Sequence, residues 1–148
     1  MTYYQNRTYY QTRKQAGADP RACARRGAQV LDDVAPGWAE FGITRKIRVE
    51  STTDCPLGQL FGSFDRGYQM IGLGWPLDGG EVLIVDSPIL KAARHQHHAA
   101  IWLGFNAMRD YRAIWAINRA WRREVRARRH AQAPPLVARV RAAVRAVV

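Results

Sequence analysis

Apolar residues recur at helical spacing over most of the chain. The clearest case follows Asp19, which can cap a helix, and Pro20, which suits the first helical position. The apolar stripe of this helix is formed by Cys23, Gly27, Val30, Leu31 and Val34. Because a proline cannot continue a helix, we expect the helix to end before the Pro36-Gly37 pair.

Start and stop signals of the same kind predict two short helices in the middle of the chain. The first should begin at Pro56 and the second after its cap Ser63, with a break at the glycine between them. The second should end at Gly72 or Gly74, although Gly67 inside it is a poor helix former.

Two longer helices are expected in the second half of the chain. Ser87 can cap a helix that begins at Pro88 and runs to about Leu103, with Gly104 as its stop. The longest helix should cover about residues 108–129 and end at the linker "AQAPP". A final short, basic and amphipathic helix should follow this linker.

Two short stretches are predicted as strands. In residues 43–50, Ile43, Ile47 and Val49 alternate with polar residues, and Arg45 is the exception on the apolar side. Residues 82–85 form the second stretch. The predicted fold is therefore mainly α: a compact helical domain with at most a small two-stranded β element and a basic C-terminal helix.

The 148 residues suffice for one ordinary domain. We predict a basic, Tyr-rich arm (1–18), a helical core domain (19–130), and a linker with the basic C-terminal helix (131–148). No apolar run approaches the ~20 residues that span a bilayer, so no membrane partner is expected. Two cysteines and a start without an apolar core favour a cytoplasmic location.

Basic residues are concentrated at both ends of the chain, which has a net charge of +11. Residues 109–148 carry eleven arginines against two acids, and residues 1–26 carry six Lys or Arg against one Asp. Residues 27–108 carry six basic residues against nine acids. This asymmetry favours an anionic partner such as nucleic acid. An Arg bias written by a GC-rich genome is the alternative explanation.

The longest predicted helix combines an apolar seam with many arginines. The seam consists of Tyr111, Ile114 or Trp115, Asn118, Trp121 and Val125. The arginines around it, which we expect to point outward, are Arg112, Arg119, Arg122, Arg123, Arg126, Arg128 and Arg129. Guanidinium groups form forked hydrogen bonds to phosphates. Because acids that could pair with them are scarce here, an ordinary solvated helix face is the weaker interpretation.

Residues with reactive side chains are sparse, and we predict no catalytic site, no metal site and no cofactor. Cys55 should lie near a helix N-terminus, which can lower a thiol pKa, but buried packing is the favoured interpretation. The glycines of "PLGQLFG" lack the spacing and the lysine of a phosphate-binding loop. His95 and His98 could share a helix face, but two ligands are too few for zinc, and His97 is expected on an apolar stripe.

Four segments carry a resemblance: "PGW" at 36–38, "CPLGQLFGSFDRGYQMIGL" at 55–73, "GF" at 104–105 and "RAWRREVRARR" at 119–129. In this order they resemble a family of small uncharacterised proteins of actinobacteria and their phages. That family has a Cys-x-Leu-Gly-Gln-Leu-aromatic-Gly core and a Trp-containing helix near its end. The resemblance implies a phage-related origin but no activity. Some relatives have a second cysteine before the core, where this chain has residues 52–54, "TTD"; this departure weakens any shared metal or disulfide role.

Together these observations favour an accessory protein that binds the nucleic-acid backbone with little sequence specificity, since no recognition motif is present. The alternative is a protein-interaction module, either a phage-encoded modulator of a host protein or a particle component, which would place it in the virion. This alternative depends on the apolar stripe of the final helix, formed by Leu136, Val140, Val144 and Val147.

Overall fold

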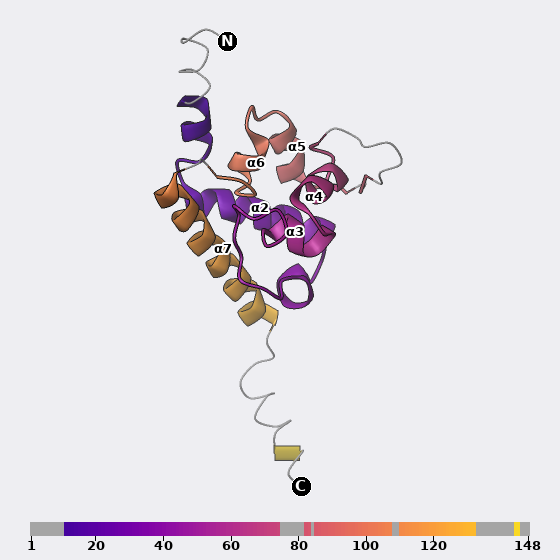
Figure 1. The fold of residues 1–148 in the computed structure, drawn as a ribbon. Helices are drawn as coiled ribbons and strands as arrows, with labels where there is room; N and C mark the ends of the chain where they lie inside the picture. The colour runs from indigo at the N-terminus through magenta and orange to yellow at the C-terminus, as the bar shows by residue number, and fades with distance from the viewer. Residues whose placement is uncertain (1–10, 75–81, 84, 108–109, 133–143, 146–148) are drawn as a thin grey trace.

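The computed structural model describes residues 11–74, 82–83, 85–107, 110–132 and 144–145. Within these residues the chain is helical and contains no strand, so the mainly α prediction is confirmed (Figure 1). Residues 11–16 form a helical segment. The later elements are α2 (Pro20–Val34), the π-helix η1 (Trp38–Gly42), α3 (Pro56–Phe61), α4 (Phe64–Met70), α5 (Pro88–Arg94), α6 (Ala99–Trp102) and α7 (Tyr111–Gln132).

The core is centred on the packing of α2 against α7, the most extensive helix contact in the fold. Trp121 of α7 is fully buried there, edge-on to Trp38 and stacked on Phe105 at 5.6 Å between ring centroids. Its indole Nε1 donates a hydrogen bond of 2.6 Å to the carbonyl of Gly104. The bond satisfies a buried indole, and α2 can lie this close because Gly27 has no side chain.

Three helix starts predicted from the sequence are confirmed. Asp19 Oδ1 accepts from Ala22 N at 3.2 Å at the start of α2. In the same way, Ser63 Oγ accepts from Arg66 N in α4 and Ser87 Oγ accepts from Leu90 N in α5, each at 3.2 Å. Each cap satisfies a backbone donor that the first helical turn leaves unpaired.

The "CPLGQLFG" stretch forms α3 and its two ends. Cys55 is the N-cap of α3, and its Sγ accepts from Gly58 N at 3.2 Å. A Cβ on Gly58 would lie 2.4 Å from the carbonyl oxygen of Thr52, so this glycine allows a close backbone approach. At the other end Gly62 adopts φ +97°, a conformation that favours glycine.

The predicted strand over residues 43–50 is wrong, although its alternation is real: Ile43, Ile47 and Val49 are buried and the polar residues between them are exposed. The backbone of this stretch has no partner strand among the described residues; several of its groups bond to side chains, and Arg48 N donates to the Asp54 carbonyl at 3.2 Å. Gln59 Oε1 accepts from the N–H groups of residues 44 and 45, and Asn118 Oδ1 accepts from that of Val49. The second predicted strand is also absent from residues 82, 83 and 85; residue 84 lies outside the described residues.

The helix predicted from Ser87 to about Leu103 is two helices, α5 and α6, separated by His95–His98. The backbone N–H groups of His95 and Gln96 donate to carbonyls three residues back, which tightens and ends α5. His98 then adopts φ −127°, ψ 62° at the start of α6. His97 is therefore exposed in the turn, and its predicted place on an apolar stripe is wrong.

The first ten residues of the predicted arm lie outside the described residues. The helical segment 11–16 contacts the turn before α6, where Thr12 Oγ1 and His98 Nε2 are 2.9 Å apart. The following Gly17 lies close to the side chain of Ile101. This part of the arm therefore packs on the helical core.

Candidate functional site

The helix α7 turns an unexpected face to solvent over its first turns. Asn118, Trp121 and Val125 are buried as predicted, but Tyr111 is 84% exposed and Trp115 is 53% exposed. Ala113 and Ile117 instead line the small cavity beside Cys23 of α2. The predicted seam is thus wrong for Tyr111, and of its alternatives Ile114 and Trp115 the half-buried one is Ile114; Tyr111 and Trp115 lie on a neighbouring face of the helix.

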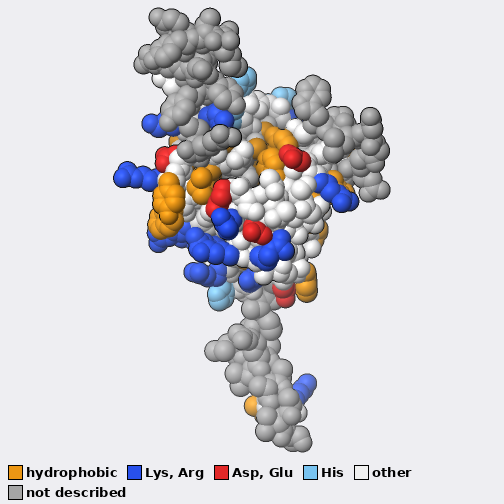
Figure 2. Space-filling model, in the orientation of Figure 1, with side chains coloured by type: hydrophobic (Ala, Val, Ile, Leu, Met, Phe, Trp, Pro, Cys, Tyr) orange, Lys and Arg blue, Asp and Glu red, His pale blue; other side chains and the backbone are white. Residues whose placement is uncertain are grey.

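Four predicted arginines lie together on this solvent side of α7. Arg119, Arg122, Arg123 and Arg126 line one open depression, and Trp115 completes it. Their spacing of three, one and three residues places all four on one helix face. Figure 2 shows basic side chains gathered beside hydrophobic ones along the side of the molecule formed by α7, at the left of the view.

These four guanidinium groups keep their charge uncompensated. None of them forms an ion pair within the described part of the chain, and Arg122 Nε donates only to the carbonyl of Asn118 at 3.2 Å. The nearby charge of Arg21 on α2, with some loss of hydration and the charges of Arg119 and Arg126, lowers the pKa of Arg123. Two helices therefore contribute positive charge to one place.

Arg128 and Arg129 use their guanidinium groups within the fold instead; the outward prediction is wrong for Arg128, which is largely covered, whereas Arg129 stays exposed. Arg128 donates to both carboxylate oxygens of Asp32, at 2.7 and 2.8 Å, and to Glu124 Oε2 at 2.6 Å. Burial alone would lower the pKa of Arg128, but these hydrogen bonds raise it above the usual value. Arg129 donates to the carbonyls of Ala39 and Ile43, each at 2.7 Å, and so ties α7 to η1.

A second open depression adjoins the first and shares Trp115 and Arg122 with it. Lys46, Arg48, Glu50 and Tyr111 also line it, and Arg48 is paired with Glu50 at 3.1 Å. We call the combined surface the aromatic-basic face; it consists of Lys46, Arg48, Tyr111, Trp115, Arg119, Arg122, Arg123 and Arg126. Sequence reasoning did not assign Lys46, Arg48, Tyr111 or Trp115 to it. The signal available for the two aromatics was their spacing of four residues, in line with the arginines that follow.

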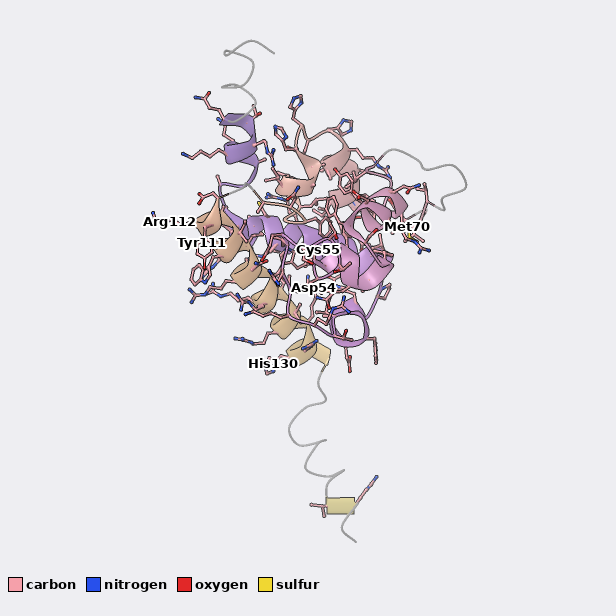
Figure 3. All side chains as sticks on the ribbon, in the orientation of Figure 1. Asp54, Cys55, Met70, Tyr111, Arg112 and His130 are labelled. Atoms are coloured by element: carbon pink, nitrogen blue, oxygen red, sulfur yellow. The ribbon has the colours of Figure 1, made fainter. Side chains whose placement is uncertain are left out.

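The start of α7 sets the outer edge of this face. Asp110 Oδ1 accepts from Arg112 N at 3.0 Å, and the Asp110 carbonyl accepts from Ile114 N at 2.9 Å. Figure 3 shows Tyr111 and Arg112 at this end of α7, on the outside of the molecule. The side chain of Arg112 is exposed and lies beyond the two depressions.

The network around Asn118 holds residues 46–50 beside α7. Asn118 Oδ1 accepts from Val49 N at 2.8 Å, and its Nδ2 donates to Glu50 Oε2 at 3.0 Å. Burial alone would raise the pKa of Glu50, but the hydrogen bonds from Asn118 and Arg48 help to hold it below the usual value. One buried amide thereby brings Lys46 and Arg48 to the aromatic-basic face.

Other candidate sites carry less chemistry. Cys55 is fully buried, and burial raises the pKa of its thiol, which favours the unreactive form. Among the described residues no group of three or more His, Cys, Asp or Glu side chains is placed to hold a metal ion. No helix in the described ranges has the length and apolar character that crossing a bilayer requires.

Of the apolar stripe predicted for the last helix, Val144 is 58% exposed, and residues 136, 140 and 147 lie outside the described residues.

Compared with known proteins, the chain matches no family model, no curated protein and no solved structure at a significant level. The resemblance to small proteins of actinobacteria and their phages therefore stays a prediction.

Proposed function

We propose that the protein binds nucleic acid through the sugar-phosphate backbone, using Arg119, Arg122, Arg123 and Arg126. The observation that supports this proposal is the gathering of these four guanidinium groups on one face of α7 without an ion pair among the described residues. Like charges placed together repel one another, and a polyanion relieves that repulsion.

The chemistry of arginine suits phosphate on an open surface. Its planar fork donates two parallel hydrogen bonds to phosphate oxygens. Each duplex phosphate that is neutralised releases counterions and adds about 0.9 to the salt dependence of the affinity. Because phosphates carry no sequence information, little sequence preference is expected.

The test measures oligonucleotide binding by fluorescence anisotropy at several salt concentrations. The Arg122→Gln/Arg126→Gln variant should bind more weakly, and its log-log salt slope should fall by about 1.4 to 1.8, at about 0.7 to 0.9 per lost contact. The matched control is Arg66→Gln/Arg94→Gln, which removes two exposed arginines from α4 and α5 and leaves α7 unchanged. Absence of binding at low salt, or equal losses in both variants, would contradict the proposal.

The protein-interaction alternative is separated from this proposal by deletion of residues 131–148. The deletion keeps Arg119, Arg122, Arg123 and Arg126 and removes the predicted C-terminal helix. A pull-down from host lysate, with and without nuclease, shows which partner class is lost. Loss of a protein partner that survives nuclease, with oligonucleotide binding intact, would favour the alternative.

A further inference from the structure

Two exposed aromatic rings lie within the aromatic-basic face, one helical turn apart. Tyr111 is 84% exposed and Trp115 is 53% exposed, whereas Trp121 on the same helix is fully buried. Trp115 lines both depressions of the face, and Tyr111 lines one of them. Their rings are therefore open to a ligand at the place where the arginines gather.

The cationic groups lie on more than one side of Trp115. The guanidinium of Arg119 is 5.2 Å from the centroid of its indole ring, a cation–π contact that orients the ring. Arg122, Arg123 and Arg126 line the first depression with it. Lys46 lines the second, where Arg48 is paired with Glu50 at 3.1 Å. A strand that crosses Trp115 would therefore meet positive charge in both depressions, most of it in the first.

We infer that this face selects single-stranded over duplex nucleic acid, with Tyr111 and Trp115 stacking on unpaired bases while the arginines hold phosphates. The inference rests on the proposed function. In a duplex each base is already covered by its neighbours, so an aromatic side chain gains nothing from it without unstacking. In a single strand every base offers a free face, and stacking on it is tolerant of sequence.

The spacing of the two rings supports the same choice. Residues 111 and 115 are four residues apart in α7, or about 6 Å along the helix axis. Successive bases in duplex DNA are only about 3.4 Å apart along each strand. Neighbouring bases can reach both rings only when the strand is unstacked, which is the state of a single strand on a stacking surface.

The experiment compares a single-stranded oligonucleotide of about 20 thymidines with a duplex of equal length, by anisotropy at one fixed salt concentration. Trp115→Ala should weaken single-strand binding roughly 5- to 100-fold and weaken duplex binding much less, because the duplex loses no stacking. Trp115→Phe keeps an aromatic ring and should restore most of the affinity. The matched control is Phe41→Ala, which removes a ring that is 80% exposed on η1, outside the face.

A second readout uses tryptophan emission. Stacking should quench the emission of Trp115 when the single strand is added, and the quenching should disappear in Trp115→Phe even though the other four tryptophans remain. The inference is overturned if Trp115→Ala weakens single strand and duplex equally or weakens neither. It is also overturned if polyglutamate of equal charge competes as well as the single strand. These outcomes leave the proposed backbone binding untouched, because that proposal fails only if the Arg122→Gln/Arg126→Gln variant gives the contrary result.

Discussion

A substitution of Gly27 tests the central packing of the fold. A Cβ at this position would lie 2.1 Å from the carbonyl oxygen of Leu103 and 2.8 Å from the indole ring of Trp121. An ordinary contact needs at least 3.4 Å, so both neighbours would have to move. Neither can move easily, since one is backbone and the other is a fully buried ring.

The expected magnitude for Gly27→Ala follows from three terms. Overpacking of a tight core costs about 1 to 3 kcal/mol, and this overlap with backbone belongs at the upper end. Displacement of Trp121 also weakens its hydrogen bond to the Gly104 carbonyl, at about 1 kcal/mol. Against this, alanine is the better helix former by about 1 kcal/mol. We therefore expect the free energy of unfolding to fall by about 3 kcal/mol.

The assay is urea unfolding followed by far-UV circular dichroism, read as a lower midpoint at an unchanged slope. Gln29→Gly and Gln29→Ala are the matched pair, because residue 29 is exposed on the same helix. At residue 29 alanine should be more stable than glycine, and at residue 27 the order should reverse. If Gly27→Ala were as stable as the natural protein, the close approach of α2, Leu103 and Trp121 would be refuted.

Two further predictions concern the cap of α3 and the network of Asn118. Cys55→Ala loses both the acceptor for Gly58 N and the buried sulfur, so the free energy of unfolding should fall by about 2 kcal/mol in the same urea assay. Cys55→Ser keeps an acceptor and should lose less stability. A serine variant less stable than the alanine variant would contradict the role of Cys55 as a cap. Because the folded pKa of Glu50 lies below its unfolded value near 4.5, its stabilising contribution is present above that value and is lost as the pH falls through the folded pKa. Glu50→Gln should therefore lose less stability than the natural protein on acidification, and parallel pH profiles would argue against this.

Local signals in the sequence predicted the helix starts well. Asp19, Ser63 and Ser87 each act within three residues of themselves, so their effect is visible in a short window. The alternation in residues 43–50 shows which side chains are buried, and this pattern predicts a strand. It does not show what the backbone groups bond to. Their partners Gln59 and Asn118 come from elsewhere in the fold.

The candidate site could be predicted only in part, because contacts between distant parts of the chain again decide where its side chains lie. Helical spacing shows that α7 has an apolar side, but not where along the helix the core ends, so it places Tyr111, and Ile114 or Trp115, inward. One partner of Arg128, Glu124, lies four residues away. The other partners of Arg128 and Arg129 are distant in sequence: Asp32 at a separation of 96, and the carbonyls of residues 39 and 43 at 90 and 86. Such partners become visible only in the folded chain.

Gly58 and Gly62 stand four residues apart in one motif, yet they are glycine for unrelated reasons. At Gly58 the limit is volume, since any Cβ meets the backbone of Thr52 and Thr53. At Gly62 the limit is handedness, since φ is +97° and nothing lies within 4 Å of the Cβ position. An L-alanine would therefore find open space at 62 on a strained backbone, and at 58 it would collide with backbone atoms, so glycine suits both positions.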